Sequence, residues 1–204
     1  MKTLYIGASG LLGSYMKIEA DRPSHLELDI TKPIKTGEYD LIVHAAAYTD
    51  VQGAETDKRE CFNVNVAGTL NLLLAYPNTP VVYISTEYAH KPVNFYSWTK
   101  KAAEELIQQQ RNYLIIRTLF KATPWPFDKA FTDQFTGGDY VDVIAPMIDE
   151  AIMKWNRKGR NMIFVETGSK TIYELAKRTK PDVIGNSIKD MKVPIPADYT
   201  DDYD

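Results

Sequence analysis

Directly after an apolar run at the start of the chain comes Ile6-Gly7-Ala8-Ser9-Gly10-Leu11-Leu12-Gly13, in which a glycine recurs at every third position. A strand, a tight turn and a helix in this order form a cradle for phosphate, because the first N–H groups of a helix have no partner inside it. We expect Gly7 to permit the turn, Gly10 to let the backbone approach a pyrophosphate and Gly13 to let the helix lie close to the sheet. The alternative is a glycine-rich turn that binds nothing. The position directly after a strand favours dinucleotide binding.

Apolar strand-like runs alternate with helical patterns along the chain, which predicts an α/β fold with a doubly wound parallel sheet covered by helices on both faces. We expect strands at Lys2–Ile6, His25–Leu28, Asp40–His44, Pro80–Ser85, Asn112–Arg117 and Met162–Val165. We expect helices at Leu11–Glu19, Cys61–Ala75, Ser97–Gln110, Val141–Trp155 and Thr171–Arg178. From Phe120 to Gly138 the pattern breaks into aromatic residues, prolines and charges. That break predicts a small C-terminal lobe beside the strand ends.

Composition excludes several classes of partner. A net charge of −3 over 204 residues argues against nucleic acid as the main partner. The chain has no run of about 18 apolar residues, so we expect no membrane span. Its single cysteine, Cys61, fits a reducing compartment, and a strand at the very start leaves no room for a signal peptide. We therefore expect a cytoplasmic protein, and the histidines show no spacing for a metal site.

An acidic residue, Asp29, lies 22 residues after Gly7. At about 20 residues after such a turn, a carboxylate binds a ribose hydroxyl in dinucleotide-binding folds. Asp29 could instead contact an adenine or cap a turn. Lys17 and Arg22 are candidates to contact a 2′-phosphate, although solvated surface positions are their more ordinary role. The choice between NAD and NADP therefore stays open.

A tyrosine and a lysine, Tyr96 and Lys100, are spaced to share one face of a helix. A nearby ammonium group favours the phenolate and lowers the pKa of a tyrosine, so such a pair can exchange a proton with a carbonyl or an alcohol. Just upstream, an apolar strand ends in the hydroxyl residues Ser85 and Thr86, either of which could hold the oxygen of a substrate. The alternatives are an exposed pair on a helix and ordinary caps at a strand end.

Together these segments resemble the extended short-chain dehydrogenase/reductase family, most closely its dTDP-4-dehydrorhamnose reductases, in a shortened form. The segments that carry the resemblance are Gly7–Gly13, Asp40–Val51, Asn63–Thr69, Tyr83–Tyr88, Tyr96–Lys100, Ile115–Thr118, Phe164–Gly168 and Tyr173–Ala176. The resemblance implies a Rossmann-type core over residues 1–118. It also implies a reduced substrate-binding lobe over residues 119–204, interleaved with the last core strand and helix.

The resemblance implies a site residue by residue. Tyr96 would be the acid/base, Lys100 its partner and Thr86 the hydroxyl of a catalytic triad. NAD or NADP would be the cofactor. The residues expected to contact it are Gly7, Ser9, Gly10, Leu11, Leu12, Gly13, Asp29, Ile30, Ala45, Ala46, Ala47, Tyr48 and Lys100.

The function that the resemblance implies is reduction of the 4-keto group of a nucleotide-linked sugar, with the proton supplied by Tyr96. Epimerisation by the same residues is an alternative. Dehydration is disfavoured, because Glu87 and Tyr88 follow Thr86 where dehydratases of the family carry an Asp-Glu pair. A third alternative is a regulatory subunit that binds NAD(P) without catalysis. Pairing of two chains through the helices at Cys61–Ala75 and Ser97–Gln110 is a further expectation.

Overall fold

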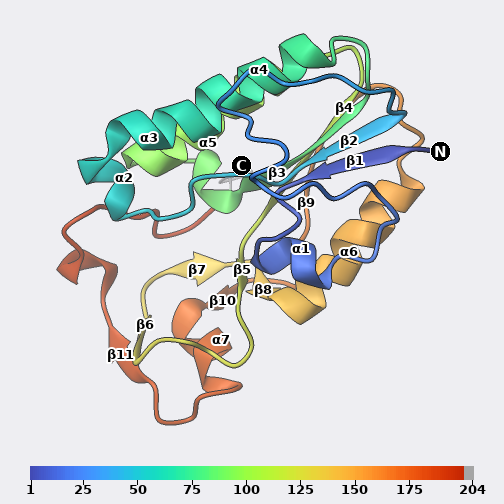
Figure 1. Ribbon diagram of the computed structural model, residues 1–204. Helices are drawn as coiled ribbons and strands as arrows, with labels where there is room; N and C mark the ends of the chain where they lie inside the picture. The colour runs from blue at the N-terminus through green and yellow to red at the C-terminus, as the bar shows by residue number, and fades with distance from the viewer. Residues whose placement is uncertain (200–204) are drawn as a thin grey trace.

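The computed structural model describes residues 1–199, and its centre is a parallel sheet of five strands in the order β1-β2-β3-β4-β9 (Figure 1). The strands are β1 (Thr3–Ile6), β2 (Leu41–His44), β3 (Val81–Thr86), β4 (Tyr113–Thr118) and β9 (Arg160–Phe164). Every adjacent pair is parallel. The predicted α/β class is confirmed.

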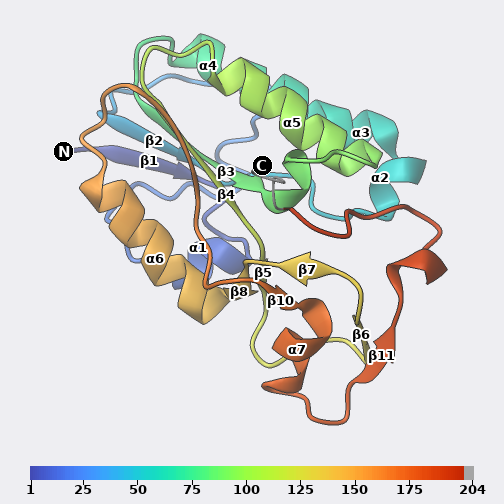
Figure 2. The same ribbon diagram turned by 180° about the vertical axis from the view of Figure 1, so that it is seen from behind.

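Helices cover both faces of this sheet, as the two opposite views show (Figures 1 and 2). One face packs against α1 (Leu11–Tyr15) and α6 (Val141–Lys154). The other face packs against α4 (Gly68–Ala75) and α5 (Phe95–Ile107). Side chains alternate between the faces along each strand, so a strand buried on both sides is apolar almost throughout.

The helical run before β3 is longer than predicted and is not uniform. It follows α2 (Gly53–Thr56) and consists of α3 (Lys58–Phe62), a π-helical turn over Asn63–Ala67, and α4. A π-helical turn widens the helix locally and often marks a functional region. Here the turn places the side chain of Asn65 in the interior, where it is 1% exposed.

A small lobe lies beyond the carboxyl ends of the central strands and has its own apolar core around Trp125, Ile172 and Leu175 (Figure 2). We use "small lobe" for β6, β7, β10, α7 and β11. Their bounds are β6 (Lys129–Phe131), β7 (Phe135–Thr136), β10 (Lys170–Thr171), α7 (Ile172–Lys177) and β11 (Ile184–Asn186). Two short strands, β5 (Phe120–Lys121) and β8 (Asp139–Tyr140), pair at its junction with the core. The predicted division at residues 118/119 stays a prediction, and residues 200–204 of that lobe lie outside the described residues.

The predicted strand at His25–Leu28 is wrong. The amide and hydroxyl of Ser24 both donate to the Glu27 carboxylate at 2.8 Å, which folds the segment into a turn and leaves Leu26 95% exposed. Local side-chain bonds of this kind compete with strand pairing. Within residues 1–199, the outer edge of β1 pairs only through an isolated bridge between Leu4 and Asp21.

Helix α1 ends four residues before its predicted end at Glu19. The guanidinium group of Arg22 donates to the carbonyl oxygens of Gly13, Met16 and Ile18, so it satisfies acceptors that a continuing helix would have used. These bonds use three of the five N–H groups of Arg22, and its contact with a 2′-phosphate stays a prediction. The other predicted helices and strands are present, with their ends shifted by a few residues. None of the helices within residues 1–199 is long and apolar enough to cross a membrane.

Candidate active site at the carboxyl ends of the strands

A cavity of about 750 Å³ lies between the glycine turn, the ends of β2 and β3, the start of α5 and the segment after β4. Parallel strands deliver their carboxyl ends to one edge of a sheet, which is where ligands bind in folds of this type. The cavity brings together every predicted site residue except Gly13. The predicted residues that line it are Gly7, Ser9, Gly10, Leu11, Leu12, Asp29, Ile30, Ala45, Ala46, Ala47, Tyr48, Thr86, Tyr96 and Lys100.

The glycine turn is built so that no larger residue fits at two of its three glycines. Gly7 has a φ of +87°, and a Cβ there would lie 2.4 Å from the backbone nitrogen of Ala46. A Cβ at Gly13 would lie 2.2 Å from the carbonyl oxygen of Ala8, so Gly13 allows α1 to pack against the turn and does not face the cavity. Gly10 meets only the Gly7 oxygen, at 3.3 Å. That contact is tight, so a side chain at Gly10 would require the Gly7 carbonyl to shift slightly.

Asp29 caps a turn and also lines the cavity. One of its carboxylate oxygens accepts bonds from the backbone and the hydroxyl of Thr31, and Lys32 lies 3.0 Å away. The hydrogen bond from the Thr31 side chain is the largest cause that lowers the pKa of Asp29 to about 2. The carboxylate is therefore ionised at the rim of the cavity.

The small-residue wall at Ala45–Tyr48 is held by Asn65, a residue to which the sequence analysis assigned no role. The Asn65 amide accepts from the backbone nitrogen of Tyr48 at 2.8 Å and donates to its carbonyl oxygen at 3.2 Å. The same amide donates to Thr99 of α5 at 2.9 Å. Asn65 thus connects the cavity wall to the helix that carries Tyr96. Its only signal in the sequence was its place within the segment Asn63–Thr69.

Tyr96 lies in the first turn of α5, which begins at a capping box. The Asn94 side chain accepts from the Ser97 backbone at 2.8 Å, and the Ser97 hydroxyl accepts from the Asn94 backbone at 3.1 Å. Burial raises the pKa of Tyr96 above its ordinary value, while the neighbouring Thr86 hydroxyl lowers it. The shift is opposite to the predicted one, because burial outweighs the hydrogen bond from Thr86. Tyr96 is therefore a protonated phenol that faces the cavity.

Lys100 lies one helical turn after Tyr96 and is 2% exposed. Its ammonium group donates to the carbonyl oxygen of Ile84 at 2.9 Å and lies 4.2 Å from the centroid of the Tyr83 ring. Burial lowers the pKa of Lys100 to about 7, although the negative charge of Glu104 raises it. Lys100 can therefore gain or lose a proton near neutral pH.

The two hydroxyl residues at the end of β3 have different surroundings. Ser85 donates to the buried Glu104 at 2.6 Å, and Glu104 is paired with Arg117 at 2.6 Å. Thr86 accepts from the backbone nitrogen of Tyr88 at 3.2 Å and adjoins the Tyr96 phenol. Both residues line the cavity; Ser85 is bound to Glu104, whereas the Thr86 side chain is hydrogen-bonded with the Tyr96 phenol.

The opposite wall comes from the segment after β4, which the sequence analysis did not assign to the site. Its lining residues are Thr118, Leu119, Phe120, Lys121, Ala122, Pro126 and Phe127. This wall was missed because nothing in its sequence spacing shows which side chains turn towards β3 and α5.

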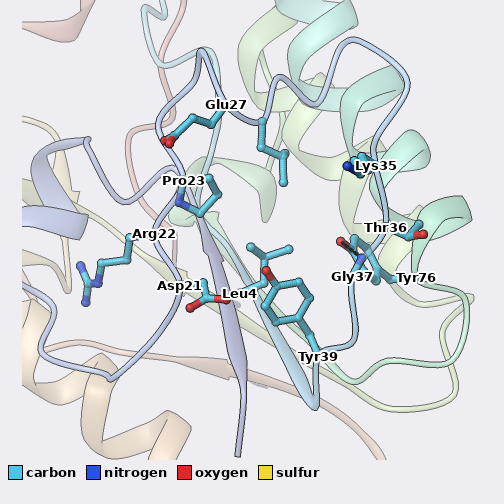
Figure 3. A pocket seen from close by; sticks show the side chains of 11 residues that line it. Leu4, Asp21, Arg22, Pro23, Glu27, Lys35, Thr36, Gly37, Tyr39 and Tyr76 are labelled. Carbon is cyan, nitrogen blue, oxygen red and sulfur yellow. Dashed lines mark hydrogen bonds between the residues drawn. The ribbon is translucent and has the colours of Figure 1, made fainter.

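A second hollow, of about 450 Å³, lies beside the cavity, and Pro23 and Leu28 border both (Figure 3). Its polar groups bind one another: the Tyr76 hydroxyl accepts from the Gly37 backbone at 3.3 Å. Arg22 points away from the ring of Tyr39 in the close view. Chemistry-bearing side chains therefore gather in the main cavity. Within residues 1–199, no group of three or more His, Cys, Asp or Glu side chains is arranged to hold a metal ion.

Part of the chain is similar in sequence to known proteins. A family described as polysaccharide biosynthesis protein matches residues 26–123. A dTDP-4-dehydrorhamnose reductase of Mycobacterium tuberculosis is 34% identical over 97 residues, which cover 40% of this chain and 31% of that protein. This part of the chain is therefore similar in sequence to the dTDP-4-dehydrorhamnose reductases.

Solved structures of 20–22% sequence identity share the fold of this chain. The dTDP-4-dehydrorhamnose reductase of Bacillus anthracis, in complex with NADP, has a TM-score of 0.78 at 22% identity and covers 97% of this chain and 89% of that one. An orthologue from Clostridium acetobutylicum has a TM-score of 0.81 at 20% identity and covers 98% and 89%. The sequence match to the Mycobacterium tuberculosis protein spans only about a third of that relative's length.

Proposed function

We propose that this chain is an NAD(P)-dependent oxidoreductase that reduces the 4-keto group of a nucleotide-linked sugar. The observation that carries the proposal is that Tyr96, Thr86 and Lys100 line the same cavity as the glycine turn. The sequence similarity to dTDP-4-dehydrorhamnose reductases and the NADP complex of the Bacillus anthracis structure support it.

The residues of the cavity fit a dinucleotide. Gly7 and Gly13 leave no room for side chains, so the turn packs closely against the start of α1. Gly10 lines the cavity and carries no side chain that could block a ligand's approach to the backbone. The wall at Ala45–Ala47 is made of small residues. We propose that these residues hold NAD or NADP. When bound, the reduced nicotinamide supplies the hydride.

The proton is proposed to come from Tyr96. Its raised pKa keeps the phenol protonated at neutral pH, which suits the donor of a proton to a carbonyl oxygen. The Thr86 hydroxyl, adjacent to that phenol, is proposed to orient the same oxygen. Lys100, tied to the end of β3, is proposed to hold the nicotinamide ribose and to supply charge close to Tyr96.

The test is the decay of NADH and NADPH absorbance with dTDP-4-dehydrorhamnose, for the wild-type protein, Tyr96→Phe and the control Tyr173→Phe. Tyr173 lies on α7, outside the cavity lining. We expect turnover in the wild type and the control, and a loss of at least 100-fold in Tyr96→Phe. Cofactor binding without turnover on this and other keto sugars would instead indicate the non-catalytic alternative.

Pairing of two chains remains a prediction. On the helices expected to pair, Leu74 of α4 is 70% exposed and Trp98 of α5 is 48% exposed. Measurement of the molecular mass in solution tests it.

A further inference from the structure

Three basic side chains line the main cavity, and two of them have partners. His25 lies 3.8 Å from the Asp29 carboxylate, and Lys100 donates to the Ile84 carbonyl. The third is Lys121. Among residues 1–199 its ammonium group makes no hydrogen bond or ion pair within bonding distance, and its nearest described partner is the ring of Phe127, 5.9 Å away. The cavity therefore contains a cation that has no anion in contact among the described residues.

The backbone at Lys121 is fixed. It belongs to β5, whose two residues pair in parallel with β8, Phe120 opposite Asp139 and Lys121 opposite Tyr140. Just before it, the Thr118 hydroxyl donates to the Val165 carbonyl at 2.8 Å, which joins this segment to the end of β9. The ammonium group is thus presented by a rigid element and not by a loose surface loop.

Among residues 1–199, the acid that acts on Lys121 electrostatically is Glu87, and it is already engaged. The Glu87 carboxylate accepts from the Thr136 hydroxyl at 2.7 Å and from the Gly137 backbone at 3.1 Å, and it is not part of the cavity lining. Burial raises the pKa of Glu87 to about 7, so its charge is incomplete at neutral pH. Burial also lowers the pKa of Lys121 despite that charge. A desolvated cation of this kind is stabilised by an anion that enters the cavity.

We propose that Lys121 binds a phosphate group of the ligand that occupies this cavity. The proposal rests on the proposed function, since both the dinucleotide and the nucleotide-linked sugar carry a diphosphate. The shared chemistry is a phosphate oxygen that accepts from the Lys121 ammonium group. Through Lys121, the segment after β4 would contact the ligand directly and contribute to its affinity.

The test compares Lys121→Gln, Lys121→Arg and the control Lys129→Gln, whose lysine is exposed on β6 and lies outside the cavity lining. Calorimetry measures the Kd of each for NADPH, for dTDP and for inorganic pyrophosphate separately. We expect Lys121→Gln to weaken binding of at least one diphosphate about 10-fold, equivalent to about 1.4 kcal/mol. Lys121→Arg should stay within a few-fold of wild type, and Lys129→Gln should not change.

The binding measurements with NADPH and with dTDP distinguish a phosphate of the cofactor from a phosphate of the substrate. A loss confined to NADPH assigns Lys121 to the cofactor, and a loss confined to dTDP assigns it to the substrate. Unchanged affinity of Lys121→Gln for all three probes overturns the proposal, and so does the lack of any pyrophosphate, NADPH or dTDP binding by the wild type. Wild-type binding without turnover on keto sugars would count against the proposed function alone, and the affinities would still decide the role of Lys121. Thermal unfolding of each variant shows whether a loss of ligand affinity comes from a loss of stability instead.

Discussion

The ammonium group of Lys100 donates a hydrogen bond of 2.9 Å to the backbone carbonyl of Ile84. That bond joins α5, which carries Tyr96, to the end of β3, which carries Thr86. The two proposed catalytic hydroxyl groups are thereby held in one place by a third cavity residue. Lys100 is almost fully buried in this arrangement, and its burial is expected to make the stability of the protein depend on pH.

Replacing Lys100 by Met is expected to change the pH dependence of stability. The pKa of Lys100 is about 7 in the folded protein, against an ordinary value of 10.5. Between these values the unfolded state binds more protons, so the free energy of unfolding rises with pH. From pH 7 to 9.5 the wild type should gain roughly 1–3 kcal/mol relative to Lys100→Met in urea unfolding without cofactor. A constant or shrinking difference would contradict a buried, titrating ammonium group.

Replacing Thr86 by Val is expected to reduce turnover about 100-fold, because a donor to the substrate oxygen is lost. Thr86→Ser keeps the hydroxyl and should retain most of the activity. NADPH affinity should be the same in both variants, since the proposed role of Thr86 concerns the substrate oxygen. Steady-state kinetics with dTDP-4-dehydrorhamnose measure the effect. Equal activity of the Val and Ser variants would remove Thr86 from the mechanism.

Replacing Gly7 by Ala is expected to cost more stability than replacing Gly168 by Ala. Both glycines have positive φ, +87° and +95°, so both variants carry backbone strain of about 1–2 kcal/mol. Only at Gly7 does the new Cβ also meet backbone, at Ala46, whereas nothing lies within 4 Å at Gly168. The steric overlap should add about 1–3 kcal/mol. Chemical denaturation of the two variants provides the comparison, and equal losses would count against the packed turn.

Replacing Glu104 by Gln is expected to destabilise the protein by about 3–5 kcal/mol, because it leaves the buried Arg117 guanidinium without its carboxylate. The neighbouring Glu105 pairs with Lys101 at 3.0 Å but is 56% exposed in its side chain. Glu105→Gln should therefore cost less than about 1 kcal/mol. Thermal and urea unfolding measure both. Similar losses at the two positions would show that burial does not decide the value of the Glu104 pair.

The sequence analysis predicted most of the central fold because its signals are local. A strand buried on both faces is apolar at every position, as in Leu41–Val43, and helices repeat their apolar residues on one side. The prediction of a strand at His25–Leu28 was wrong, because local side-chain bonds outweighed the apolar pattern there. The apolar residues were there, but Ser24 and Glu27 bind each other and close a turn first.

The predicted site residues met in one cavity because most of them follow strand ends or share a helix face, and parallel strands bring such positions together. The partners of those residues were not predictable in the same way. Asn65 holds Tyr48 across 17 residues of sequence, and Glu104 reaches Arg117 from a helix to a strand. Contacts of this kind leave no periodic trace in the chain.

The sequence by itself determined the alternation of strands and helices, the glycine turn and the pairing of Tyr96 with Lys100 on one helix. Each depends on neighbours within a few residues, so residue types and spacing encode it. Only the tertiary structure decided which groups are removed from water. Burial raised the pKa of Tyr96 where the sequence predicted a fall, and packing left Lys121 in the cavity wall with no anion in contact among residues 1–199. Desolvation depends on everything packed around a group, and that is settled only when distant segments of the chain meet.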